Sequence, residues 1–165
     1  MPRRLIVAAD GGSRGNPGPA GYGAVVLDAA TGEVLAELRG SIGRATNNVA
    51  EYSGLLAGLR EAGRIAPGAA TAVRVDSRLV VEQMTGRWKI RHPDLLPLAQ
   101  AAREAAAPLG PVRYTRVPRE RNAHADRLAD EAMDASRRSA ASAGRGASRS
   151  GTNALGRPRP GARPG

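Results

Sequence analysis

Four carboxylates stand where a buried element of the sequence meets a polar loop or a helix start. Asp10 follows the apolar run RRLIVAA and precedes the glycine-rich segment GGSRGNPGPAGYG. Because glycine has no Cβ, the backbone after Asp10 can approach a ligand closely. Three further acids lie in equally distinctive contexts: Glu51 in TNNVAEYSGLLAGL, Asp76 in VRVDSRLVVEQM and Asp126 in VPRERNAHADRLADEAM. These contexts predict one site built from acids that are far apart in the chain.

The chemistry that four neighbouring carboxylates allow is metal-dependent. Carboxylates in one place raise one another's pKa unless a cation lies between them. Magnesium prefers hard oxygen ligands, so an all-carboxylate site suits Mg²⁺ better than Zn²⁺. Two such ions can clamp the attacking and leaving oxygens of a phosphodiester. Each acid taken singly is more often a helix cap, a turn residue or a surface charge, so the prediction depends on the four together.

Short polar side chains flank these acids. Asn16 lies in the glycine-rich segment, and Arg44, Thr46, Asn47 and Asn48 precede Glu51. Such groups can hydrogen bond to sugar hydroxyls, base edges and phosphates, which is what recognition of the wide, shallow minor groove of an RNA-containing helix requires. The alternative is that the asparagines only cap a helix and the glycines only turn the chain.

Periodicity predicts the elements that must position these residues. Residues 33–39 alternate polar and apolar types, as in a strand, whereas 47–63 place apolar residues at helical spacing after a possible N-cap at Thr46 or Asn47. The full prediction has strands over 3–9, 22–27, 33–39, 72–75 and 112–117, and helices over 47–63, 77–84, 93–107 and 122–135.

The order βββ-α-β-α-α-β-α predicts an α/β fold with a five-stranded mixed sheet flanked by helices. Short links make the first three strands antiparallel, and helical crossovers join the later ones. If the first and fourth strands are neighbours, Asp10 and Asp76 meet at one rim of the sheet. Glu51 and Asp126, both early in their helices, could point at the same rim.

Composition excludes several classes of protein. The chain has no cysteine, no signal peptide and no apolar run of the roughly 18 residues that a membrane helix needs, so we expect a cytoplasmic protein without membrane contact. Seven arginines and no acid lie in 137–165, so this segment carries most of the net charge of +10. We expect a folded domain over 1–136 and a disordered tail or linker over 137–165. The tail could add salt-dependent affinity for nucleic acid, or it could be a plain solvated linker.

The segments DGGSRGNPGPAGYGAVV, TNNVAEY, VDSRLVVEQM and RNAHADRLADEAM together resemble ribonuclease H type 1. They are most similar to the N-terminal domain of bacterial bifunctional ribonuclease H/acid phosphatase proteins. The resemblance covers roughly residues 3–136 and rests on four motifs in the right order. It implies a ribonuclease H-like fold and an endonuclease that cuts the RNA strand of RNA–DNA hybrids with Mg²⁺, or Mn²⁺ as a substitute, leaving 3′-hydroxyl and 5′-phosphate ends.

The resemblance also implies roles for individual residues. It assigns metal binding and catalysis to Asp10, Glu51, Asp76 and Asp126. It assigns contacts with the hybrid to Gly11, Gly12, Ser13, Asn16, Asn47 and Asn48, and a pocket for a DNA phosphate to Arg44 and Thr46. Two metal ions would act with the substrate bound.

The chain departs from the family pattern in the region after the second helix. Longer members carry a basic helix and loop there, whereas this chain runs through TGRWKIRHPD directly to the next helix. Substrate affinity would then depend on Arg87, Trp88, Lys89 and Arg91. Trp88 could stack on a deoxyribose or a base, or it could fill the edge of the core.

A second departure concerns the loop before the last acid. Many members keep a histidine there, but the loop in this chain is RVPRERN. His124 lies two residues before Asp126 on a helix, so the two side chains face apart and His124 is predicted to be a surface residue. We expect Arg119 or Arg121 to take over the histidine's role in product release.

The ending of the sequence leaves two alternatives for its parent protein. In the fused relatives an acid phosphatase domain follows, but this sequence reaches RPRPGARPG without an RHG motif. Either a C-terminal phosphatase domain belongs to a longer parent chain or it has been lost, and no phosphatase activity is expected of these residues. We expect a monomer.

Two rival functions remain open at this point. One is a catalytically silent module that binds hybrid or duplex RNA, which the presence of all four acids disfavours. The other is a different nuclease of the same fold, such as a junction resolvase or transposase, which the polar TNN segment before Glu51 disfavours.

Overall fold

A five-stranded sheet with strand order β3-β2-β1-β4-β5 forms the centre of the computed structural model, which describes residues 3–156. Antiparallel pairing joins β1 to β2 and β2 to β3, and parallel pairing joins β1 to β4 and β4 to β5. The predicted mixed sheet with three antiparallel strands first is therefore confirmed. The strands are β1 (Arg4–Ser13), β2 (Gly18–Asp28), β3 (Val34–Ala45), β4 (Ala70–Val75) and β5 (Val112–Arg116).

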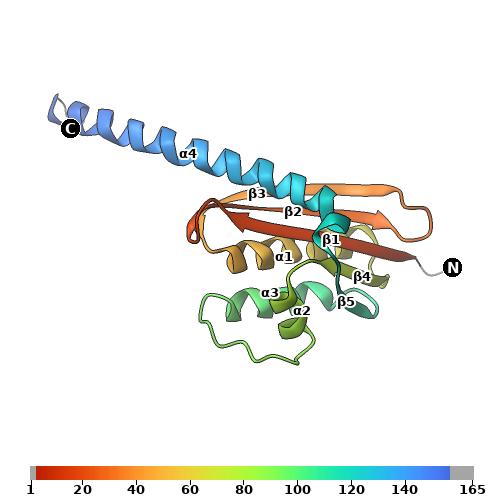
Figure 1. Cartoon of the computed structure of the whole chain (residues 1–165). Coiled ribbons are helices and arrows are strands. Elements are labelled where there is room, and N and C mark those ends of the chain that lie inside the picture. Colours follow the sequence, from red (N-terminus) through yellow and green to blue (C-terminus); the bar gives the residue numbers. More distant parts are fainter. Residues whose placement is uncertain (1–2, 157–165) are drawn as a thin grey trace, which may run out of the picture.

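Helices cover the two faces of the sheet unequally. Three helices, α1 (Asn47–Ile65), α2 (Arg78–Met84) and α3 (Leu96–Ala106), lie on one face, and α4 (Ala123–Gly156) crosses the other (Figure 1). A short 3₁₀ turn, η1 (Arg119–Asn122), leads from β5 into α4. The main core lies between the sheet and α1, where Leu5, Val7, Leu55 and Leu59 are fully buried. Each such side chain stabilises the fold by roughly 1.5–3 kcal/mol through burial.

Glycines allow α1 to lie directly on the first strand. A Cβ on Gly54 of α1 would stand 2.6 Å from the carbonyl oxygen of Asp10, and one on Gly58 would stand 2.5 Å from a methyl carbon of Val7. Gly11 of β1 has the same restriction, because a Cβ there would stand 2.2 Å from the Ala50 carbonyl oxygen. The backbone of α1 is thereby held against the part of β1 that carries Asp10.

Two element boundaries differ from the sequence prediction in ways that matter for the site. The first strand was predicted to end at residue 9, but β1 continues through Asp10 and the glycines to Ser13, where it pairs with Ala20 of β2. Gly11 and Gly12, which suggested a loop, are instead strand residues, and Gly11 lies in close contact with α1. Asp10 thus projects from within a strand.

The second difference is the length of the last helix. Its end was predicted at residue 135, with a disordered tail from 137, but α4 continues to Gly156 and projects beyond the sheet (Figure 1). The disordered tail over 137–165 stays a prediction, and the structure describes a helix for the part of it up to Gly156. Alanine and arginine, which favour helices, are frequent here, and no proline interrupts the sequence before Pro158. Residues 157–165, the last part of the predicted tail, lie outside the described residues.

No helix among residues 3–156 combines the length and the apolar composition needed to cross a membrane.

Candidate active site

The four predicted carboxylates line a single cavity of about 300 Å³ at one edge of the sheet. They come from four elements: Asp10 from β1, Glu51 from α1, Asp76 from the end of β4 and Asp126 from the start of α4. Because β1 and β4 are parallel neighbours, their carboxyl ends meet at the same edge. Acids up to 116 positions apart in the chain are thus brought together as predicted.

Helix caps fix the acids next to them. Thr46 caps α1, and its Oγ1 accepts a hydrogen bond from the Val49 amide at 3.3 Å, which sets the first turn from which Glu51 projects. Ser77 follows Asp76 and caps α2 in the same way, through the Val80 amide at 3.2 Å. Both acids are therefore adjacent to a helix start that is locally determined.

Two buried hydrogen bonds tie the elements of the site together. The Tyr52 hydroxyl donates to Oε1 of Gln83 at 2.8 Å and so joins the helix of Glu51 to the helix that follows Asp76. The Asn122 amide nitrogen donates to the Ala9 carbonyl oxygen at 2.8 Å, across 113 positions of sequence. This second bond holds the start of α4 against β1, immediately beside Asp10. Sequence reasoning assigned no role to Tyr52, Gln83 or Asn122.

Burial shifts two of the carboxylates toward their neutral forms. It raises the pKa of Asp10 to about 8, and the contact with Asp126 and the charge of Asp76 add to the rise. Burial likewise raises the pKa of Glu51 to about 7, helped by Asp76 and opposed by Ser77. A cation in the cavity would restore the charged forms, so the site favours positive charge.

The donor set fits a hard divalent cation. Every candidate ligand is a carboxylate oxygen, which is the ligand type that Mg²⁺ prefers. Within the described residues, no three acidic or histidine side chains form a ready metal-binding group. The four side chains therefore share a cavity but would have to reorient in order to hold an ion.

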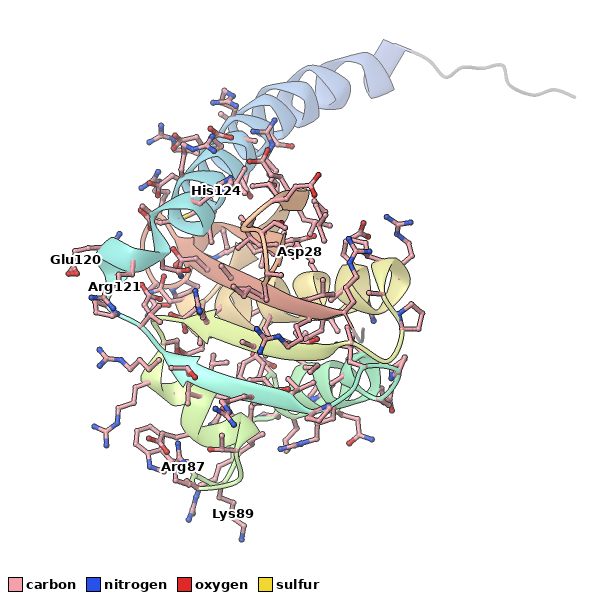
Figure 2. The ribbon with its side chains drawn as sticks, turned by 90° about the vertical axis from the view of Figure 1, so that its right-hand side faces the viewer. Asp28, Arg87, Lys89, Glu120, Arg121 and His124 are labelled. Atoms are coloured by element: carbon pink, nitrogen blue, oxygen red, sulfur yellow. The ribbon has the colours of Figure 1, made fainter. Side chains whose placement is uncertain are left out.

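One arginine lies at the cavity beside these acids. The Arg119 guanidinium is 3.4 Å from Oδ1 of Asp126, and the charges of Asp126 and Asp10 raise the pKa of Arg119 further above its ordinary value. Arg119 also lines the cavity. Arg121, the other residue predicted for product release, points outward from η1 beside Glu120 (Figure 2) and does not belong to the cavity lining.

The residues predicted to contact a hybrid are arranged around the cavity in different ways. Gly11, Gly12, Ser13 and Asn47 line it directly. Oδ1 of Asn47 accepts from the Ser13 amide at 2.8 Å, and Oδ1 of Asn16 accepts from the Asn47 amide at 3.0 Å. Asn48 is half-buried in the first turn of α1. These asparagines thus fasten the loop after β1 to the helix start.

Arg44 and Thr46, predicted to hold a phosphate, share a second hollow. It measures about 680 Å³ and is also lined by Pro17, Val49, Asp94 and Leu98. Arg44 is exposed at the end of β3. The structure therefore brings the two predicted residues together in a hollow separate from the carboxylate cavity.

Trp88 does not fill the edge of the core. Its side chain is 41% exposed, and the Arg78 guanidinium lies 5.2 Å from the centre of its ring, a cation–π contact. Arg87 and Lys89 project from the same loop after α2, at the end of the molecule opposite α4 (Figure 2). The prediction that Trp88 stacks on substrate stays a prediction.

His124 lies outside the cavity, as its helical position predicted. Its Nε2 contacts the Glu37 carboxylate of β3, and Figure 2 shows His124 near the start of α4.

The structure adds residues that sequence reasoning missed. Asp130, Met133 and Arg14 also line the cavity, and Arg14 lies 3.6 Å from Asp130 and 3.1 Å from Asp134. Asp126, Asp130 and Asp134 recur every fourth residue and so share one face of α4. This spacing in DRLADEAMD was the signal that could have identified them.

The motifs agree with comparisons to known proteins. The family described as reverse transcriptase-like matches residues 8–132. The bifunctional protein Rv2228c of Mycobacterium tuberculosis is 59% identical over 138 residues, covering 84% of this chain and 38% of the relative. The ribonuclease HI of Halobacterium salinarum is 45% identical over 131 residues, covering 79% of this chain and 65% of the relative. The chain thus spans less than two thirds of the length of these curated relatives.

Solved structures give closer correspondence in length. The N-terminal ribonuclease H domain of Rv2228c, a fusion with maltose binding protein, matches with a TM-score of 0.81 and 57% identity, over 84% of this chain and 99% of that one. RNase H1 of the archaeon Halobacterium salinarum matches with a TM-score of 0.75 and 44% identity, over 79% and 98%. LC11-RNase H1, in complex with an RNA/DNA hybrid, matches with a TM-score of 0.70 and 38% identity, over 79% and 97%.

The four motifs, the sheet order and the near-complete coverage of solved ribonuclease H domains agree, and the chain belongs to the ribonuclease H type 1 family.

Proposed function

We propose that this domain hydrolyses the RNA strand of RNA–DNA hybrids by a two-metal-ion reaction that leaves 3′-hydroxyl and 5′-phosphate ends. The observation that carries the proposal is the convergence of four carboxylates from four elements on one cavity. A protein that only binds nucleic acid gains nothing from an anionic cluster that faces phosphate, since like charges repel. Among similar structures, LC11-RNase H1 is in complex with an RNA/DNA hybrid.

Asp10, Glu51, Asp76 and Asp126 would hold the metal ions, with Mg²⁺ as the natural cofactor and Mn²⁺ as its substitute. When bound, the ions would activate the attacking water and stabilise the leaving 3′ oxygen. Asp10 and Glu51 must lose their protons to act as ligands, and their raised pKa values make metal affinity dependent on pH.

Residues in and around the cavity would position the substrate. The backbone of Gly11, Gly12 and Ser13 would lie along the RNA sugars, and Asn16, Asn47 and Asn48 would lie in the minor groove. Arg44 and Thr46 would bind a phosphate of the DNA strand in their separate hollow. Trp88, exposed beside Arg78, would stack on a sugar or base farther along the hybrid. Arg119 would assist product release by competing for Asp126.

One assay with four labelled substrates tests this function. The protein is incubated with Mg²⁺ and an RNA–DNA hybrid, duplex DNA, duplex RNA or single-stranded RNA. We expect cleavage of the RNA strand in the hybrid alone, with products that a ligase requiring a 5′-phosphate can rejoin. Binding of the hybrid without cleavage would identify a silent module, and cleavage of duplex DNA would identify another nuclease of this fold.

A further inference from the structure

Part of the sheet has no helix over it. On the face crossed by α4, that helix packs against β2, β3 and β1 and leaves β4 and β5 uncovered. The same arrangement is visible in Figure 2, where β1, β4 and β5 face the viewer and α4 lies above them. A sheet face open to solvent normally carries scattered polar residues, so the composition of this one is informative.

Three arginines stand on this open face. Strand register pairs Ala70 with Arg4, Ala8 with Arg74, and Ala72 with Arg113. Because side chains alternate along a strand, the three arginines share one face, and Val7 lies on the other face against Gly58 of α1. We call Arg4, Arg74 and Arg113 the sheet arginines.

The sheet arginines surround a hollow of about 370 Å³ with no acidic residue in its lining. Ile6, Ala70, Ala72 and Pro111 form its apolar floor. All three arginines are exposed, and none forms an ion pair with another described residue. The hollow therefore presents three cations over a floor that cannot neutralise them.

One acid at this end of the sheet, Asp28, is already engaged. Asp28 lies 3.5 Å from Nε of Arg3, and its Oδ1 accepts hydrogen bonds from the amides of Ala30 and Thr31. These contacts lower the pKa of Asp28, with the Thr31 amide contributing most. Asp28 is thus occupied by Arg3 and by the amides of the turn after β2, and the sheet arginines remain available to an external ligand.

The spacing of the sheet arginines suits an extended anion. Arg4 and Arg113 stand two strands apart, roughly 10 Å, and Arg4 and Arg74 are offset by four residues along the strands, roughly 13 Å. A phosphodiester backbone offers charges over such a length, whereas a single small anion does not. The hollow has no aromatic residue in its lining, so contacts would go to phosphates and not to stacked bases.

We propose that the sheet arginines bind the phosphates of a single-stranded extension of the substrate, outside the catalytic cavity. The inference rests on the proposed function, because it requires a nucleic acid at the cavity. Arg74 lies two residues before Asp76 on β4, so one end of this surface adjoins the cavity. A strand that continues beyond the hybrid can pass from the carboxylates onto the open face.

The test compares two ligands and two sets of substitutions in the full chain. Asp10→Asn is included throughout so that RNA is not cut during the measurement. The ligands are a short blunt hybrid and the same hybrid with a single-stranded extension of about 12 nucleotides, placed at each end in turn. The test variant is Arg4→Gln/Arg74→Gln/Arg113→Gln. Its matched control, Arg60→Gln/Arg64→Gln/Arg103→Gln, removes the same charge from α1 and α3 on the opposite face of the sheet.

We expect at least one extension to strengthen binding roughly tenfold at low salt, and the test variant alone to lose that gain. Three fewer phosphate contacts should make the slope of log Kd against log salt for the extended hybrid shallower by about 2. Equal gains in both variants, or equal losses in both, would overturn the proposal.

Further results distinguish this proposal from other roles of the sheet arginines and from the proposed function. If the blunt hybrid is cleaved by the unsubstituted chain but no extension helps, the sheet arginines have another role while the proposed function stands. Polyglutamate and single-stranded DNA are compared as competitors at equal concentrations of negative charge. If polyglutamate displaces the extension as effectively as the DNA does, the surface recognises acidic protein and the proposal fails. Failure to bind or cut any hybrid would instead refute the proposed function.

Discussion

Strands β1 and β4 each carry an arginine, and an aspartate lies farther along each, Asp10 within β1 and Asp76 directly after β4; the two kinds of residue stand in opposite environments. Arg4 and Arg74 lie exposed on the open face, whereas Asp10 and Asp76, farther along β1 and β4, line the carboxylate cavity. Asp10 is only 9% exposed and its pKa is raised to about 8. The comparison teaches that burial, more than charge count, decides which group can drive chemistry.

The largest expected effect comes from substituting the buried aspartate, Asp10. Asp10→Asn keeps the shape of the side chain but removes a ligand charge, so cleavage of a hybrid at saturating Mg²⁺ should fall by about a thousandfold or more. Circular dichroism and the thermal midpoint check that the fold is retained. Cleavage within tenfold of the unsubstituted rate would remove Asp10 from the catalytic group.

The raised pKa of Asp10 predicts how stability depends on pH when no metal is present. The folded state binds a proton that the unfolded state has released above about pH 4, so the contribution of Asp10 to the unfolding free energy is most favourable at low pH. It should fall as pH rises from about 4 toward 8, at a scale of about 1.4 kcal/mol for each pKa unit. Glu51, raised to about 7, acts in the same direction.

Urea unfolding in EDTA between pH 5 and 9 measures this loss, and it should amount to a few kcal/mol. Adding Mg²⁺ should restore stability mainly at the alkaline end, where the carboxylates are charged. Asp10→Asn should flatten the metal-free profile. A stability that rises with pH in EDTA would contradict the assignment of a buried, protonated Asp10.

The smallest expected effect distinguishes Arg119, which lines the cavity, from Arg121, which does not. Arg119 contacts Asp126, so Arg119→Ala should lower kcat roughly tenfold and leave Kd for a blunt hybrid nearly unchanged. Arg121→Ala removes the same charge from the outer side of η1 and should change kcat less than about twofold. Steady-state kinetics with a hybrid substrate compare the two, and equal rates in both variants would refute a role of Arg119 in turnover.

The sequence predicted most elements because they depend on local pattern, and it predicted that the four acids converge, whereas their catalytic role stays a prediction. The spacing of Val49, Tyr52 and Leu55 predicted α1, and the acids at the ends of apolar runs predicted the cavity. The end of β1 was missed because glycine is unfavourable in most strands. Here the close backbone of Ala50 makes Gly11 necessary within the strand.

Features that need three-dimensional register were not predictable in this way. The sheet arginines come from three strands, and only the pairing of β1, β4 and β5 brings them together. Arg14 reaches Asp130 and Asp134 across more than 100 positions of sequence. The far end of α4 was missed because a composition rich in Ser, Gly and Arg is typical of disorder, although its alanines also favour a helix.

The bond from Asn122 to the Ala9 carbonyl joins the opening segment of the domain to nearly its last element. The carboxylate group is incomplete until α4 docks and delivers Asp126. On the proposed function, a chain still being synthesised would be unable to cut nucleic acid before this region has emerged from the ribosome. The proposed nuclease activity would thus be acquired late, only when the start of α4 has docked against β1.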